Sequence, residues 1–120
     1  MEDLLSSLGA EPVTFGQNAE CCGAYQTLTW RAATLNRTHA VLGSAAAAGA
    51  QGLVTSCPLC AYNLDQMQRE AVKRYPDLPS LPIFYYSELM SLAFGQAWPE
   101  QWKALHHIDP QPLLNSAAGA

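Results

Sequence analysis

The sequence predicts an α/β domain in which a small parallel sheet is flanked by helices in three layers. Segments with helical and strand-like apolar patterns alternate along the chain, which is typical of parallel sheets whose strands are connected by helices. The chain has 120 residues and 49% of them are hydrophobic, which is enough for one domain with its own core.

The first half of the chain contains two expected helices and two expected strands. Residues 2–8 carry acidic side chains at their start and are followed by a glycine, which favours a short helix. Pro12–Phe15 is a brief β-prone segment. Between Leu28 and Ala48, apolar residues recur at alternating spacings of four and three, which predicts the longest helix. Leu53–Thr55 then follows as a compact buried strand.

A second long helix is expected directly after this strand. Pro58 suits its first position, because the N–H that proline lacks has no partner there in any helix. The helix is expected to continue to Tyr75, and Asp65 and Arg69 are expected to pair on its solvent-facing side.

The remainder of the chain supplies one more strand and one more helix. Ile83–Tyr85 is the third expected strand, and Ser87 is expected to cap a helix that ends at Phe94. From Trp98 onward prolines interrupt the chain, and residues 115–120 are expected to be a disordered tail. A sheet of three short strands leaves an open edge, which something should cover.

The composition argues against several classes of function. Only 13% of residues are charged, the net charge is −4, and the 6 basic residues form no run, which argues against nucleic acid and anionic membranes as partners. No apolar stretch approaches the ~20 residues of a transmembrane segment. The acidic start is unlike a signal peptide, so we expect a cytoplasmic location. The low charge also indicates surface that a partner covers.

The chemistry that the sequence suggests depends on its cysteines, which are Cys21, Cys22, Cys57 and Cys60. In a reducing compartment such cysteines are metal ligands or redox thiols more often than disulfides. Cys57 and Cys60 form a Cys-x-x-Cys motif at an expected strand-to-helix turn, where the helix dipole favours the thiolate of Cys57. Side chains of adjacent residues diverge, so Cys21 and Cys22 suit a cluster of several irons better than a single ion.

Both cysteine motifs follow expected strands, and we therefore expect them to meet at one rim of the sheet. Other uses of the thiols stay open at this point. Cys57 and Cys60 are also typical of a thioredoxin-like dithiol exchanger, and all four cysteines together could hold a structural zinc ion. The histidines, His39, His106 and His107, are expected in packing, capping or surface roles.

Two motifs resemble those of one protein family. Glu20-Cys21-Cys22-Gly23-Ala24 and Thr55-Ser56-Cys57-Pro58-Leu59-Cys60 are similar to motifs of the cysteine-rich CCG domain in the B subunit of heterodisulfide reductase. The similarity begins in the first residues and ends around Pro112-Leu113-Leu114, so residues 1–114 resemble a partial CCG domain, the second of the two copies in that protein. Glycolate and lactate oxidation iron–sulfur subunits share the cysteines but are less similar elsewhere.

The resemblance implies that Cys21, Cys22, Cys57 and Cys60 are the ligands of a 4Fe-4S cluster, which in this family is of a non-cubane type. It implies an iron–sulfur-binding subunit or fragment of a heterodisulfide reductase-like oxidoreductase. Such a protein, if it acts as an enzyme, passes electrons to a disulfide or thiol substrate as part of a complex. Its expected partners are the other iron–sulfur and flavin subunits, or a second copy of itself.

One feature departs from the family pattern. The family has a further cysteine several tens of residues before the vicinal pair, whereas none of the 20 residues before Cys21 is a cysteine. We therefore expect either a shortened fragment or a naturally split subunit, and we expect it to self-associate or be unstable when isolated. The alternatives to the non-cubane cluster are a conventional cubane cluster, or zinc in a non-catalytic assembly domain.

Overall fold

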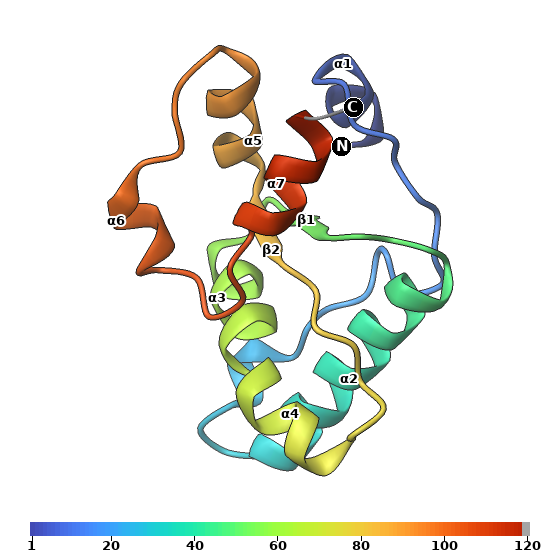
Figure 1. Ribbon diagram of the computed structural model, residues 1–120. Helices are drawn as coiled ribbons and strands as arrows, with labels where there is room; N and C mark the ends of the chain where they lie inside the picture. Colours follow the sequence, from blue (N-terminus) through green and yellow to red (C-terminus); the bar gives the residue numbers. More distant parts are fainter. Residues whose placement is uncertain (119–120) are drawn as a thin grey trace.

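A short parallel sheet lies near the centre of the domain, between two groups of helices (Figure 1). The computed structural model describes residues 1–118. Strands β1 and β2 pair in parallel, with Leu53 opposite Ile83, and helices form the crossover that a parallel pair requires. The elements in chain order are α1 (Glu2–Ser7), the 3-10 helix η1 (Ala24–Gln26), α2 (Arg31–Ala47), β1 (Leu53–Thr55), α3 (Pro58–Gln66), α4 (Gln68–Arg74), β2 (Ile83–Tyr85), α5 (Tyr86–Ala93), α6 (Glu100–Lys103) and α7 (Gln111–Ala118).

The core lies where α2, α3 and α4 pack against one another and α3 contacts both strands. Figure 1 shows these three helices below the strands, and α1, α5 and α7 above them. Burial of apolar side chains is the main force that holds such a layer together. The buried apolar residues are Cys22, Leu35, Val41, Leu42, Ala45, Leu64, Met67, Ala71, Leu78, Leu81, Ile83 and Phe84. One of the four cysteines is therefore part of the core.

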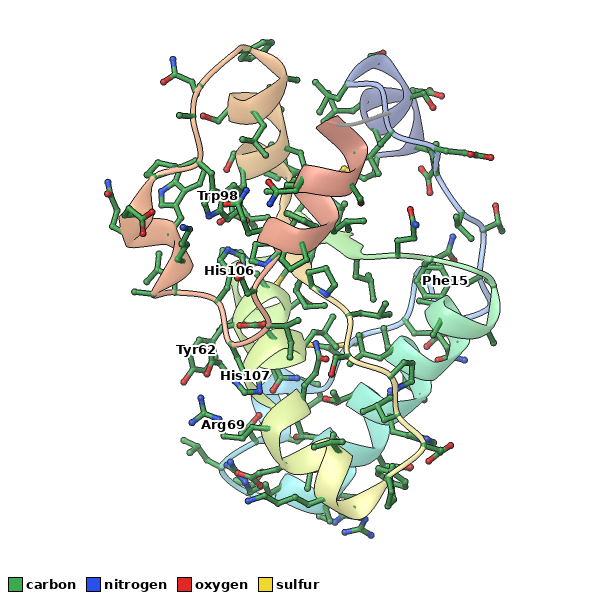
Figure 2. The ribbon with its side chains drawn as sticks, in the orientation of Figure 1. Phe15, Tyr62, Arg69, Trp98, His106 and His107 are labelled. Carbon is green, nitrogen blue, oxygen red and sulfur yellow. The ribbon has the colours of Figure 1, made fainter. Side chains whose placement is uncertain are left out.

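The expected α/β class is confirmed, but residues 1–118 contain two strands rather than three. The strand expected at Pro12–Phe15 is wrong, because this segment is irregular and makes no backbone hydrogen bond to β1. Pro12 has no N–H to donate to a strand ladder. The aromatic ring of Phe15 packs against the core instead (labelled in Figure 2).

The first long helix is shorter than expected. It begins at Arg31 rather than Leu28, because the preceding residues form η1 and further turns. The hydroxyl of Thr27 donates to the carbonyl of Ala24 at 2.8 Å, and such local bonds compete with helix formation. Leu28 is consequently not on the apolar helix face, and it is 97% exposed.

The second long helix is divided at Met67, a turn residue at the edge of the right-handed helical region, so that α3 and α4 follow one another. The pair expected between Asp65 and Arg69 is wrong. Asp65 is buried, where it accepts hydrogen bonds from backbone N–H groups of a later segment, and Arg69 instead contacts His107.

Helices α5 and α7 also differ from expectation. Tyr85, not Ser87, is the N-cap of α5, and its N–H donates to the Glu88 side chain at 2.8 Å. Helix α7 includes residues 115–118 of the expected disordered tail, and residues 119–120 lie outside the described part of the chain. No helix within residues 1–118 is long and apolar enough to cross a membrane.

Candidate functional site

The two adjacent cysteines lie in a tight turn just before η1. Gly23 has a φ of +78°, a backbone conformation that favours glycine, and its N–H donates to the Sγ of Cys21 at 3.4 Å. A Cβ atom at Gly23 would stand only 3.3 Å from the Cγ of Arg37. Cys22 is buried in the core, whereas Cys21 is exposed. The turn therefore directs one thiol inward and the other toward solvent.

Side chains of α2 fix the backbone of this turn. The Thr34 hydroxyl, which is fully buried, donates to the carbonyl of Gly23 at 3.2 Å. The Arg37 Nε donates to the carbonyl of Cys21 at 3.2 Å, and its Nη2 donates to Gln17 at 3.0 Å. Two carbonyls that flank Cys22 are thus held by one helix.

Helix α3 fixes the same turn from the other side. The buried Asn63 donates its side-chain N–H to the carbonyl of Cys22 at 3.5 Å, and its Oδ1 accepts from the Thr27 hydroxyl at 3.3 Å. None of these supporting residues was expected from the sequence. The sequence indicates them only through polar residues, such as Thr34 and Asn63, that stand among apolar residues on helices and need buried hydrogen-bond partners.

The second cysteine motif lies where β1 leads into α3. Cys57 is the N-cap residue and Pro58 occupies the first helical position, as expected. The Thr55 hydroxyl accepts the N–H of Cys57 at 3.1 Å and donates to the carbonyl of the same residue at 2.9 Å. Thr55 therefore fixes the orientation of Cys57 relative to the strand, and α3 places Cys60 one turn further on.

The two motifs meet through one pair of thiols. The Sγ atoms of Cys60 and Cys22 are 3.2 Å apart, although 38 residues separate them in the chain. Cys57 is exposed and Cys60 is partly buried. The expected meeting of the two motifs is confirmed, although the strand expected before Cys21 does not exist. Within residues 1–118, no three Cys, His, Asp or Glu side chains converge closely enough to hold a single metal ion.

The two thiols of the Cys-x-x-Cys motif differ in acidity. The pKa of Cys57 is lowered mainly because the backbone N–H of Cys60 stabilises its thiolate, with the Cys60 side chain as the next cause. Burial, followed by the neighbouring Cys22 and Cys57, raises the pKa of Cys60 to about 12. Cys57 is therefore the more readily ionised of the two thiols, and Cys60 keeps its proton at neutral pH.

Three of the four cysteines, Cys22, Cys57 and Cys60, line a cavity of about 840 Å³. One wall follows β1, and the others come from α1, the segment after it, α2 and α7. A volume of this size is in the range of cofactor and ligand pockets. Cys21 does not line the cavity. Of these three cysteines, Cys57 is exposed, Cys60 is partly buried and Cys22 is buried in the cavity wall.

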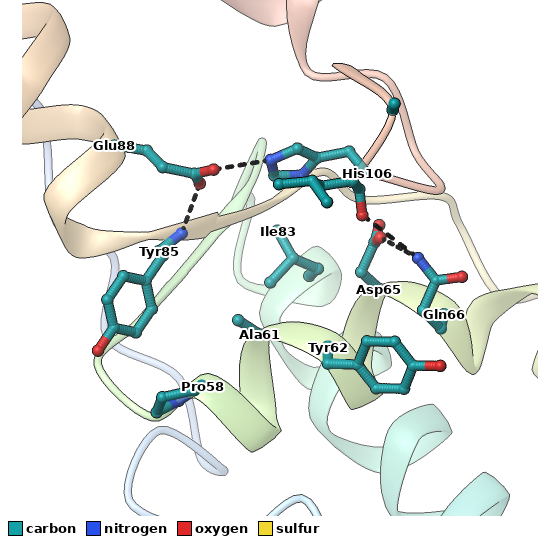
Figure 3. Close-up of a pocket in the computed structure, with 11 residues that line it drawn as sticks. Pro58, Ala61, Tyr62, Asp65, Gln66, Ile83, Tyr85, Glu88 and His106 are labelled. Atoms are coloured by element: carbon teal, nitrogen blue, oxygen red, sulfur yellow. Dashed lines mark hydrogen bonds and ion pairs between the residues drawn. The ribbon is translucent and has the colours of Figure 1, made fainter. Parts of the chain in front are cut away.

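A smaller pocket of about 530 Å³ adjoins Pro58 (Figure 3). On its wall the Nε2 of His106 lies 2.9 Å from a Glu88 oxygen, and this hydrogen bond raises the pKa of His106. The other histidines also have structural roles, because the His107 Nδ1 lies 3.3 Å from an Arg69 nitrogen and His39 stacks on an aromatic ring. Figure 2 labels His106 and His107, and no histidine of residues 1–118 lines the cysteine cavity.

The donor set fits an iron–sulfur cluster. Thiolates are the ligands that such clusters use, and the N–H of Gly23 already donates to one of the sulfurs. The thiols lie on two turns of the chain, and the contact between Cys22 and Cys60 brings one sulfur from each turn together. The assignment of Cys21, Cys22, Cys57 and Cys60 as ligands stays a prediction.

Comparison with known proteins agrees with this chemistry. The family described as "CCG: Cysteine-rich domain" matches residues 1–65. The chain is 32% identical over 94 residues to the 8-methylmenaquinol:fumarate reductase membrane anchor subunit of Wolinella succinogenes, a match that covers 78% of this chain and 33% of the relative.

Two further relatives are the B subunits of heterodisulfide reductases. The chain is 28% identical over 96 residues to that of the ferredoxin/F(420)H(2)-dependent CoB-CoM heterodisulfide reductase of Methanosarcina acetivorans. It is 27% identical over 96 residues to that of the ferredoxin:CoB-CoM heterodisulfide reductase of Methanosarcina mazei. Each match covers 78% of this chain and 32% of the relative. The chain therefore spans about a third of the length of these relatives.

Proposed function

The chain belongs to the family of cysteine-rich (CCG) domains, and on this premise we propose that Cys21, Cys22, Cys57 and Cys60 together hold a 4Fe-4S cluster. The observation that carries the proposal is the contact of Cys22 with Cys60, whose Sγ atoms are 3.2 Å apart. A fold that brings thiols from two distant turns into contact, without joining them in a disulfide, provides the ligands that such a cluster needs.

Each cysteine has a distinct part in this proposal. Cys57, with its lowered pKa, offers the first thiolate, and its orientation is fixed by Thr55. Cys22, which is buried, and Cys60, which packs against the core, would supply two further thiolates. The N–H that Cys21 accepts from Gly23 is the kind of hydrogen bond to sulfur that tunes the potential of a cluster.

We propose that the domain serves as an iron–sulfur redox module of a multi-subunit, heterodisulfide reductase-like enzyme. A bound cluster would supply one-electron chemistry next to the cavity. Reduction of a disulfide breaks one S–S bond, consumes two electrons and two protons, and gives two thiols. The electrons would come from a partner protein of the complex or a ferredoxin, as the names of two relatives indicate for those proteins. We propose a cytoplasmic location, because cysteines that bind a cluster must stay reduced and the cytoplasm keeps thiols reduced.

Anaerobic purification tests the cluster directly. The wild-type chain, reconstituted with iron and sulfide, should be brown and contain about four irons and four sulfides per chain. Cys22→Ser should lose most of the iron and the visible absorbance, because it removes one of the four proposed thiolate ligands. Ser56→Ala is the matched control, since Ser56 lines the same cavity and provides no sulfur. It should retain the iron of the wild-type chain.

Other outcomes decide between the proposal and its alternatives. Iron content that is unchanged by Cys22→Ser would refute the ligand assignment. A colourless protein with one zinc per chain would indicate an assembly domain. A metal-free protein with a titratable Cys57–Cys60 disulfide would indicate a dithiol exchanger, a role that the lowered pKa of Cys57 also suits.

A further inference from the structure

The three backbone carbonyls of the turn at residues 21–23 each accept a hydrogen bond from a helix side chain. In chain order, the donors are the Nε of Arg37 at 3.2 Å, the side-chain N–H of Asn63 at 3.5 Å and the hydroxyl of Thr34 at 3.2 Å. Of these three donors Arg37 is charged, and a hydrogen bond from a charged group is roughly twice as strong as one between neutral groups. Arg37 is therefore expected to hold this turn most firmly.

The Arg37 side chain is held at both its head and its stem. Its Nη2 donates to the Oε1 of Gln17 at 3.0 Å, so the guanidinium joins the segment before the cysteines to the cysteine turn. Its stem lies against Gly23, where a Cβ atom would be only 3.3 Å from the Arg37 Cγ. Both oxygens that accept from the guanidinium are neutral, one from an amide and one from a peptide carbonyl. These bonds therefore fix the position of the positive charge without cancelling it.

A positive charge at this position acts on a group that the cysteines hold. A 4Fe-4S cluster with four thiolate ligands carries a net negative charge, which increases when the cluster is reduced. A fixed cation nearby stabilises the more negative, reduced form and so raises the reduction potential. Glu2, Glu11 and Glu20 line the cavity next to the cysteines and act in the opposite sense. The charge of Arg37 therefore has the sign that favours reduction of the cluster.

We propose that Arg37 is a positioning residue of the cluster site, which fixes the Cys21 end of the turn and supplies a positive charge that raises the reduction potential of the cluster. This inference rests on the proposed function, because the potential belongs to the bound cluster. Arg37 provides no ligand atom and acts through the backbone of Cys21 and through its charge. Lysine carries the same charge but lacks the planar fork that binds two acceptors at once. The two parts of the role can therefore be separated by substitution.

Redox titration of the reconstituted chain, followed by visible absorbance under anaerobic conditions, measures the effect of the charge. Arg37→Gln should shift the equilibrium constant for one-electron reduction roughly tenfold toward the oxidised form, which corresponds to a potential about 59 mV more negative. Arg37→Lys should keep the potential of the wild type, even if it binds less iron because the turn is held less firmly. Arg74→Gln is the matched control, because it makes the same change of charge and Arg74 packs over the ring of Tyr75 instead of binding the turn. It should leave the potential unchanged.

A second measurement uses the metal-free chain, and it also covers an Arg37→Gln variant that fails to retain the cluster. Cys21 is exposed, and its thiolate attacks the S–S bond of an added disulfide to form a mixed disulfide and release one reagent thiolate. The disulfide of thionitrobenzoate is a dianion, whereas dipyridyl disulfide is neutral. The ratio of the two rates at Cys21, read by peptide mass spectrometry, cancels the fraction of thiolate present. At low salt this ratio should fall roughly threefold in Arg37→Gln, and the difference should shrink at high salt.

The outcomes for the charge and for the cluster are distinguishable. A wild-type chain that takes up no iron would refute the proposed function, whereas the reagent ratio at Cys21 does not require a cluster and still tests the fixed charge. An unchanged ratio in Arg37→Gln would overturn the proposal, and so would equal potentials of this variant and the wild type. A potential of Arg37→Lys as low as that of Arg37→Gln would also overturn it, because the turn rather than the charge would then set the potential.

Discussion

Asp65 attaches the C-terminal third of the chain to α3, and its replacement tests how strongly one buried carboxylate holds the domain together. Asp65 is 3% exposed and accepts the backbone N–H groups of His107 at 2.6 Å and Ile108 at 3.0 Å. The side-chain N–H of Gln66 donates to it at 3.0 Å. Asp65→Asn keeps the shape of the side chain but replaces one acceptor oxygen with an NH₂ donor.

The expected loss follows from these contacts. The asparagine oxygen can serve only one of the two backbone N–H groups well, and the other then faces a second donor. A hydrogen bond to a charged group contributes about 1.5 to 3 kcal/mol, and a neutral one about 0.5 to 1.5 kcal/mol. Losing one charged bond and reducing the other to a neutral bond should lower the free energy of unfolding by about 2.5 to 4.5 kcal/mol.

Urea unfolding followed by circular dichroism measures this loss, with the wild type and variant compared at one pH. Asp77→Asn is the matched control, because the Asp77 side chain is 82% exposed and lies 3.9 Å from the His39 ring nitrogen. It should change stability by no more than about 0.5 kcal/mol. If Asp65→Asn costs less than about 1 kcal/mol, the two backbone bonds do not hold the C-terminal segment in place, and the reasoning fails.

Three further predictions follow from the same contacts. The hydrogen bond to Glu88 raises the pKa of His106 above the value of about 6.5 expected in the unfolded chain. Protonated His106 therefore stabilises the fold fully below that unfolded pKa, and this contribution is lost as the pH rises through the higher folded pKa. In urea unfolding, the difference in stability between the wild type and His106→Gln should shrink as the pH rises. At about pH 8, iodoacetamide should modify Cys57 of the metal-free chain before Cys60, and peptide mass spectrometry that shows the reverse order would contradict the pKa directions. Gly23→Ala should cost about 1 to 2 kcal/mol in unfolding measurements, because the φ of +78° strains any residue with a Cβ.

The parts of the fold that depend on local chemistry could be predicted from the sequence. Leu53–Thr55 and Ile83–Tyr85 are strands, as predicted, because an apolar run of this length between turn residues is too short for a helix. Cys57 and Pro58 start a helix because the N-terminal turn tolerates proline. In each case the deciding residues lie within a few positions of the element itself.

The parts that depend on distant partners could not be predicted. A periodic pattern places Asp65 on the solvent-facing side of a helix, but a segment more than 40 residues later folds over it and uses it as an acceptor. Pro12–Phe15 has strand-like side chains, but no pattern in it reports whether a neighbouring strand offers it hydrogen bonds. Such errors arise because tertiary contacts override local preference.

Two buried threonines on α2 show how a polar residue in an apolar helix pattern can be informative. Thr34 and Thr38 are fully buried on α2, at positions where an apolar helix face predicts aliphatic residues. A buried hydroxyl needs a partner, because leaving it without one costs about 1 to 3 kcal/mol. Thr34 finds that partner in the carbonyl of Gly23, and Thr38 bonds to the carbonyl of Thr34 one turn earlier. A buried threonine on a helix can therefore bond back to its own helix, as Thr38 does, or hold another segment, as Thr34 holds the turn of Cys21 and Cys22.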